Sequence, residues 1–66
     1  MRQMLIFNED LQFNQRVGMP VKVYCRTRQK TLALGRIQAI TPHFINVSKT
    51  WFMRRDYLII GIAPTE

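Results

Sequence analysis

Cationic side chains alternate with apolar ones in residues 20–28, and one aromatic ring stands among them. With the period of two that a β-strand imposes, Val21, Val23 and Cys25 point to one face, which we interpret as core. The other face is basic and aromatic: Lys22, Tyr24, Arg26 and Arg28. Such a face suits a polyanion with stackable bases, because cations hold phosphates and stacking contributes about 1–3 kcal/mol per base. The alternative is a solvated outer face, which a half-buried sheet needs in any case.

The next strand extends this face. If the polar residues 28–30 close a hairpin, Arg36 and Gln38 lie beside the first strand. No carboxylate stands between these cations in the sequence, which favours nucleic-acid contact over a plain polar face. The predicted contact residues are Lys22, Tyr24, Arg26, Arg28, Lys30 and Arg36.

A second group of aromatic and basic residues lies further along the chain: Trp51, Phe52, Arg54, Arg55 and Tyr57. Consecutive strand residues face opposite ways, so only one of the two adjacent rings belongs to the core. The other ring is exposed or covered by a partner. We interpret the group as an oligomer interface, ahead of base stacking. We expect Asp56 to pair with an adjacent arginine at little energetic effect.

Catalytic and metal-binding residues are sparse. Cys25 alternates with core residues and behaves as a small hydrophobe, while the nearby cations point to the other face. His43 follows Pro42 in a turn and has no titratable neighbour in the sequence for acid–base chemistry. One cysteine and one histidine do not supply the four ligands of a zinc site. With no paired-carboxylate motif or glycine-rich phosphate loop, we predict no enzyme activity, no metal and no cofactor.

The length and composition limit the architecture and the partners. A chain of 66 residues allows a single domain, which we assign to residues 1–66. Its core is marginal at this length and its lone cysteine excludes an internal disulfide, so tight packing or self-association must add stability. The hydrophobic fraction of 47% favours a homo-oligomer, and the net charge of +6 favours a polyanionic partner.

The cellular location is predicted from what the sequence lacks. The apolar run at residues 4–7 is too short for a signal peptide or a membrane span. A lone cysteine on a core face suits a reducing compartment. We therefore expect a cytoplasmic protein with no membrane partner.

The N-terminal part predicts a short helix over residues 9–17. Asn8 is a suitable N-cap, and two acidic residues follow it at the positive helix start. Gly18 suits the left-handed position after the helix, and Pro20 prevents its continuation. Residues 4–7 form either an edge strand or an earlier helical turn.

After Pro20 the pattern is all β. We expect strands over residues 21–27, 31–40 and 44–48, a turn at 41–43, and two further strands that divide 51–63. Residues 49–50 form a turn, or the third strand continues to Trp51. Gly35 in the second strand predicts a bulge or a sharp bend. Five short, strongly bent antiparallel strands suggest a small closed or nearly closed barrel over residues 20–64, since open edges would promote aggregation.

Four segments resemble the Sm-like proteins: Met-Pro-Val-Lys-Val-Tyr at 19–24, Gly-Arg-Ile-Gln-Ala-Ile at 35–40, Phe-Ile-Asn-Val at 44–47 and Tyr-Leu-Ile-Ile-Gly-Ile-Ala-Pro at 57–64. Among these proteins the chain resembles the Hfq family of bacterial RNA chaperones, which has a short helix, a Pro-Val-x-hydrophobic-Tyr first strand and a Gly-x-Ile second strand. The resemblance covers residues 9–64. It implies a five-stranded Sm-like or SH3-like barrel, a homo-oligomeric ring whose fourth and fifth strands pair with a neighbour, and single-stranded RNA as ligand.

Two positions depart from the family pattern. Thr41 stands where family members usually carry an acidic residue, and Arg-Asp-Tyr at 55–57 replaces the Tyr-Lys-His of the nucleotide pocket. The pocket residues are therefore not carried over to this chain. Two hypotheses remain: a non-enzymatic Sm-like subunit that binds single-stranded RNA, or a protein-interaction module or regulator that docks on an acidic partner surface.

Overall fold

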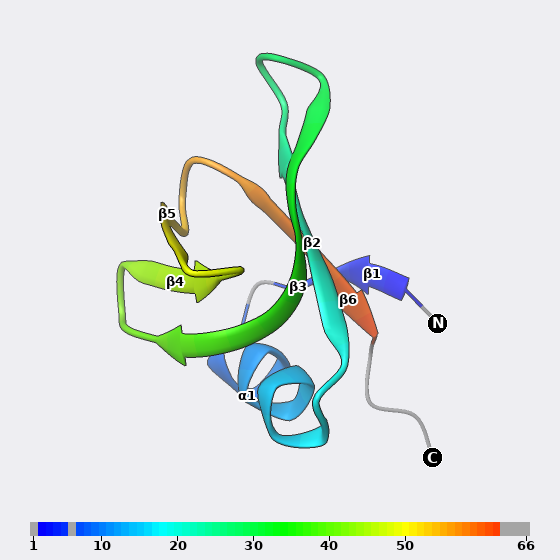
Figure 1. The fold of residues 1–66 in the computed structure, drawn as a ribbon, viewed down its shortest axis with the longest axis vertical. Helices are drawn as coiled ribbons and strands as arrows, with labels where there is room; N and C mark the ends of the chain where they lie inside the picture. The colour runs from blue at the N-terminus through cyan, green and yellow to red at the C-terminus, as the bar shows by residue number, and fades with distance from the viewer. Residues whose placement is uncertain (1, 6, 63–66) are drawn as a thin grey trace.

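The protein is mainly β, with one short helix near its N-terminus (Figure 1). The computed structural model describes residues 2–5 and 7–62. Its elements are β1 (Arg2–Met4), α1 (Asn8–Val17), β2 (Pro20–Cys25), β3 (Lys30–Ile40), β4 (Phe44–Val47), β5 (Thr50–Met53) and β6 (Leu58–Ile62). The six strands form one sheet in the order β1-β6-β2-β3-β4-β5, and every pair is antiparallel. The predicted fold class is confirmed at this level; positions 63 and 64 of the predicted barrel lie outside the described residues.

The helix begins differently from the prediction and ends as predicted. Phe7, in an extended conformation, holds the N-cap position, so the assignment of Asn8 as N-cap is wrong. Asn8 is the first helical residue, and no side chain caps the helix. Gly18 adopts the left-handed conformation with φ of 74°, and its N–H donates to a carbonyl of the last turn. Leu11 and Asn14 form the buried face of α1.

The alternation of β2 confirms the predicted core face. Val21, Val23 and Cys25 are buried, while Lys22 and Tyr24 are half-buried on the other side of the strand. This period of two sets the two faces of the sheet: an inner face toward α1 and the core, and an outer face toward solvent.

The hairpin between β2 and β3 turns earlier than predicted. β2 ends at Cys25, which pairs with Lys30, and residues 26–29 form the turn. The positive φ of Gln29, 54°, reverses the chain there. The prediction of a strand to residue 27 is therefore wrong, and Arg26 and Arg28 lie in the turn rather than on a strand face.

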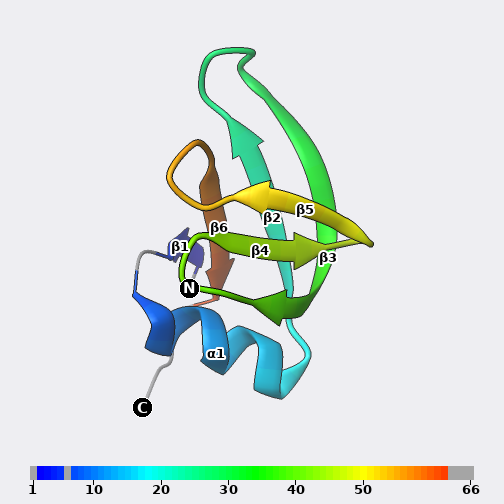
Figure 2. The same ribbon diagram turned by 90° about the vertical axis from the view of Figure 1, so that its left-hand side faces the viewer.

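The long strand β3 joins the two halves of the sheet. Figure 2 shows it curving between β2 on one side and β4 on the other. Register shifts occur near both of its ends, one between Val23 and Tyr24 of the partner strand and one between Ile37 and Ala39. Gly35 lies between these irregularities, where a Cβ would collide with the hydroxyl of Ser48 from the β4–β5 turn. The predicted bend thus brings the β4–β5 turn close to Gly35.

The sheet is open, so the closed or nearly closed barrel expected from the sequence is not confirmed. Its ends are β1, which pairs with β6 through Met4 opposite Ile60, and β5. Of the alternatives for residues 4–7, the edge strand holds for Met4. The third strand does not continue to Trp51: a turn follows it, one residue earlier than the expected residues 49–50. Ser48 and Lys49, both with positive φ, form this turn, and Thr50 begins β5.

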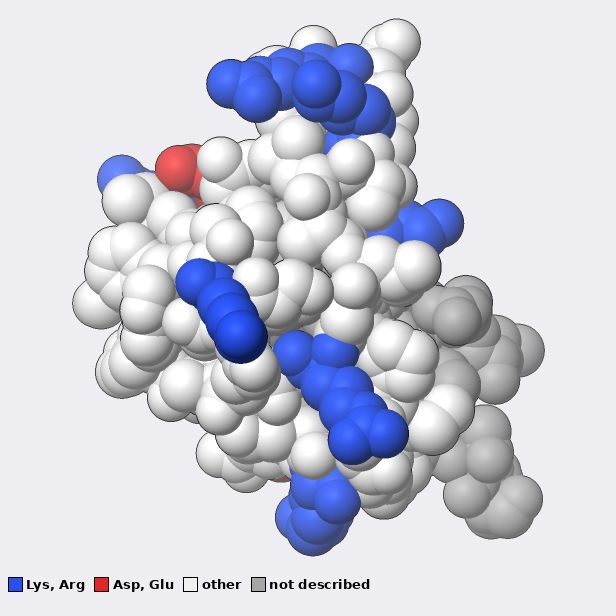
Figure 3. Space-filling view, in the orientation of Figure 1, with Lys and Arg blue, Asp and Glu red and all other residues white. Residues whose placement is uncertain are grey.

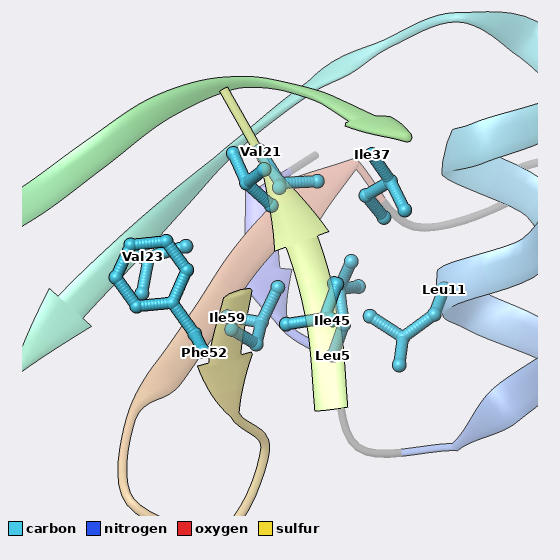
Figure 4. Packing of buried hydrophobic residues seen from close by; sticks show 9 residues of the cluster. Leu5, Leu11, Val21, Val23, Ile37, Ile45, Phe52 and Ile59 are labelled. Carbon is cyan, nitrogen blue, oxygen red and sulfur yellow. The ribbon is translucent and has the colours of Figure 1, made fainter. Parts of the chain in front are cut away.

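One hydrophobic core fills the concave side of the sheet (Figure 4). Helix α1 and the residue after β1 close it with Leu11 and Leu5. The remaining buried members come from every strand except β1: Val21, Val23, Ile37, Ile45, Val47, Phe52 and Ile59. The core thus depends on contacts between distant parts of the chain, because no element buries its apolar side chains alone.

Gly61 is the tightest point of this core, and we predict that Gly61→Ala destabilises the fold by about 2–3 kcal/mol through overpacking. An added Cβ would lie 2.6 Å from Leu5 Cδ1, 2.7 Å from Asn14 Oδ1 and 3.0 Å from Val21 Cγ1, and all three side chains are buried. Urea unfolding measures the loss.

The matched control is Gly35→Ala. Its added methyl meets only the end of the exposed Ser48 side chain, which can rotate away at the loss of its 3.2 Å hydrogen bond to the Leu34 carbonyl. We expect a cost below about 1 kcal/mol there. Equal losses in the two variants would contradict the packing argument.

Candidate nucleic-acid interface

Three predicted contact residues gather at the tip of the β2–β3 hairpin. Arg26 and Arg28 stand in the turn and Lys30 begins β3, and all three are exposed; we call them the tip cluster. Figure 3 shows cationic side chains at this projecting tip and further ones spaced down the same view of the molecule. At the left of this view an acidic side chain lies beside a cation. The tip cluster therefore presents concentrated positive charge with no carboxylate partner among the described residues.

The outer face below the tip is more apolar than predicted. Lys22 lies between Ile60 of β6 and Leu34 of β3, and Met4 of β1 lies opposite Ile60. We call Met4, Ile60, Lys22 and Leu34 the outer row. Leu34 is 61% exposed and Met4 46%. The sequence predicted cations beside Lys22; its cross-strand neighbours are aliphatic.

Tyr24 connects the outer row to the tip cluster. It is half-buried and lies opposite Leu58 and Thr31, two residues closer to the turn than Lys22. Directly opposite residues of an antiparallel pair project to the same face, so its ring is on the outer face. Lys30, opposite Cys25, projects to the inner face instead. The tip cluster consequently surrounds the hairpin end rather than continuing one stripe.

Arg36 and Gln38 sit at the helix end of β3. Arg36 lies opposite Pro20, diagonal to Lys22, and its guanidinium carbon is 3.9 Å from the position of a Cβ on Gly18. Gln38 falls in the bulge; its side-chain oxygen accepts from the Lys49 N–H at 2.8 Å. The structure brings Arg36 near Lys22 but separates it from the tip cluster by the length of β2.

The predicted interface residues divide into core and surface. Phe52 is 8% exposed and packs edge-on against Tyr57, with ring centroids 5.5 Å apart. Trp51 is 52% exposed on the opposite face of β5. The prediction that only one of the two adjacent rings is core is confirmed, and Phe52 is that ring.

Arg54 and Arg55 have different surroundings. Arg54 Nη1 donates to the carbonyls of Thr41 at 2.7 Å and Pro42 at 3.3 Å, which ties the β5–β6 turn to the β3–β4 turn. Arg55 is exposed, and its Nε lies 4.0 Å from Asp56 Oδ1. Both members of that pair are solvated, so it contributes little. Arg54 is thus a structural cross-link, and Arg55 is available for contact.

The lone cysteine and histidine have separate environments. Cys25 Sγ lies 3.2 Å from Thr27 Oγ1, and this hydrogen bond, with those to the backbone of Arg28 and Thr27, lowers the pKa of the buried thiol. His43 is exposed in the β3–β4 turn. Within the described residues, no three His, Cys, Asp or Glu side chains converge as metal ligands, and no helix is long and apolar enough to cross a membrane.

Sequence reasoning missed the outer row. Two signals pointed to it: Leu34 shares its strand parity with Arg36, and residues 58–60 are apolar on both faces. A continuous apolar run indicates a strand covered on both sides. The contribution of Met4 had no comparable signal, because β1 is only three residues long.

Comparison with protein-family models, with curated proteins and with solved structures gives no match for this chain.

The Arg54 cross-link leads to a stability prediction. We expect Arg54→Gln to destabilise the fold by about 1–2 kcal/mol, because two turn carbonyls lose a charged donor. Arg55→Gln, which removes the same charge one residue later, should change stability by less than about 0.5 kcal/mol. Thermal or urea unfolding of both variants measures the difference. A loss in the Arg55 variant that equals the loss in the Arg54 variant would show that charge, not the cross-link, matters.

Proposed function

We propose that the protein is a non-enzymatic, Sm-like subunit that binds single-stranded nucleic acid, with RNA as the favoured ligand. The observation that carries the proposal is the tip cluster: three exposed cations in five residues, without a carboxylate partner among the described residues. Cations in this arrangement bind phosphates and release counterions, which gives salt-dependent affinity.

We expect the bound nucleic-acid strand to run from the hairpin tip toward helix α1. Arg26, Arg28 and Lys30 would hold phosphates at the projecting hairpin end. Tyr24 lies next to the turn on the outer face and would stack on a base. Lys22 and then Arg36 would continue the phosphate contacts, since they are diagonal neighbours further along the same face.

The fold supports the Sm-like part of the proposal. The helix and the strands that carry the resemblance form in the expected order, as α1, β2, β3, β4 and β6. The last of them returns to pair with β2, and β3 is strongly curved (Figure 2). Under this proposal, pairing between copies would complete the barrel, because the sheet of a single chain is open.

We propose in addition that copies associate through the free edge of β5. Its pairing partner within the chain is β4, so its other edge has unpaired backbone groups among the described residues. The exposed Trp51 lies on this strand. The resemblance implies that the last strand also pairs with a neighbour, but β1 already covers the edge of β6 at residues 60–62. Pairing there would require β1 to move.

The free, buried thiol of Cys25 supports a cytoplasmic, reducing location.

The salt dependence of oligonucleotide binding tests the primary function. We expect a labelled single-stranded RNA to bind with an affinity that falls steeply with salt. In Arg26→Gln/Arg28→Gln the slope of log K against log salt should decrease by about 1.4, since each phosphate contact on a single strand contributes about 0.7.

The control is Arg16→Gln/Arg55→Gln, which removes two exposed charges on α1 and in the β5–β6 turn. It should leave that slope within about 0.3 of the parent value. Equal effects of the two double variants would show that binding depends on the net charge of the protein and not on the tip cluster. Binding that is absent, or insensitive to salt, would remove the proposed function.

The outer row favours a second candidate function, docking on an acidic protein surface. Its aliphatic residues offer apolar contact to a partner protein. Lys22 lies among them, so a complementary partner surface would place a carboxylate opposite its ammonium group. The same Lys22 disfavours face-to-face contact of two copies. Under this function Leu34→Ser and Lys22→Glu each abolish binding of a purified acidic partner, while RNA affinity of the parent chain is negligible.

The free β5 edge predicts self-association. Native mass spectrometry of the full chain should give a closed oligomer at micromolar concentration, and Trp51→Pro should shift it toward monomer. The pair of Val47 and Thr50 closes the two-residue turn, so the N–H of Trp51, opposite Asn46, points away from β4, and proline removes it from the free edge. The control is Lys22→Gln on the outer row, which lies away from β5. This variant should form the same oligomer as the parent chain. A monomer at all concentrations would exclude the homo-oligomer.

A further inference from the structure

A cavity lies where the sheet fails to close. It has a volume of about 570 Å³ and opens between the start of α1, the end of β1 and the β5–β6 turn. Its lining combines aliphatic residues of the core with the β3–β4 and β5–β6 turns. The size lies within the range of small-molecule sites, roughly 300–1,000 Å³.

The floor of the cavity is aliphatic. Leu5, Leu11 and Ile59 belong to the buried core and are brought together there (Figure 4). Met4 and Met53 add flexible thioether side chains that adapt to a ligand's shape. Tyr57 packs against Phe52 with the two rings nearly perpendicular. This floor suits an alkyl chain better than a planar ring.

The rim of the cavity is cationic. Arg54 is held in place by its bonds to Thr41 O and Pro42 O, and these use only Nη1. Arg55 is exposed, and its contact with Asp56 is a solvated pair at 4.0 Å that a stronger acceptor can replace. A guanidinium offers two parallel N–H donors, and a carboxylate accepts both of them. A neutral head group makes a weaker contact with the same guanidinium.

We propose that this cavity binds an aliphatic carboxylate, with the alkyl tail over the floor that Leu11 and Ile59 form and the carboxylate against Arg55. The site is distinct from the tip cluster, which lies at the far end of the hairpin, so it stands or falls independently of nucleic-acid binding. Because the ligand binds the folded chain, it raises the unfolding temperature.

Octanoate and the full-length chain provide the test. Calorimetry should give one saturable site per chain, octanol should bind more weakly than octanoate, and acetate should not bind. Methyl NMR should place the shifts on Leu11 and Ile59 rather than on Leu34 of the outer row. The unfolding temperature should rise with octanoate concentration.

Two charge variants locate the head group. Arg55→Gln should weaken octanoate binding about fivefold, whereas Arg16→Gln, an exposed cation on α1, should leave it unchanged. Equal affinities in the two variants, shifts at Leu34 instead of Leu11 and Ile59, or absence of saturable binding would each overturn the proposal. So would shifts of the cavity methyls with protein concentration alone, because a second copy would then occupy the cavity.

Discussion

The curvature of β3 is the constraint on which the other features of this protein depend. This strand pairs with β2 over its first part and with β4 over its last part, so it belongs to both halves of the sheet. Its bend brings Ser48 of the β4–β5 turn close to Gly35. Because β3 turns, β4 and β5 fold over the inner face and enclose a core of residues from almost every element. A straight strand of the same length would leave that apolar face in solvent.

The same curvature sets the positions of the surfaces discussed for function. The start of β3 projects beyond the body with β2, which separates the tip cluster from the rest of the molecule (Figure 1). The end of β3 carries β5 toward β6 without reaching it. The β5–β6 turn is held to β5 by the contact of Phe52 with Tyr57 and to the β3–β4 turn by the Arg54 cross-link, and the cavity lies beside them. An open edge, a basic tip and an apolar cavity are therefore three consequences of one bent strand.

The excess of positive charge is tolerated because it is dispersed outward. Most cations have no carboxylate partner among the described residues, and exposed charges in water repel each other weakly at physiological salt. Arg54 differs: two carbonyls bind it and it stabilises the turns. This division explains why the cations at the hairpin tip are suited to a ligand and Arg54 is not. Net charge alone would not distinguish them.

Local features of the chain could be predicted from the sequence. The alternation of Val21, Val23 and Cys25 reports the inner face of β2, because strand geometry fixes the period regardless of context. Gly18 ends the helix through its left-handed conformation, and adjacent positions in a strand force Trp51 and Phe52 to opposite faces. Errors occurred at boundaries, where Phe7 rather than Asn8 caps α1 and the hairpin turns at residues 26–29.

Only the tertiary structure decided which distant residues become neighbours. Lys22 lies between Ile60 and Leu34 because register is set by long-range pairing, not by its own segment. The three-residue β1 forms only because β6 offers an edge, and the Arg54 contacts exist only because two turns meet. The residues 20–28 themselves determine a basic hairpin with an apolar inner face. What surrounds that hairpin, and whether the sheet closes, follows from curvature and packing that no single segment encodes.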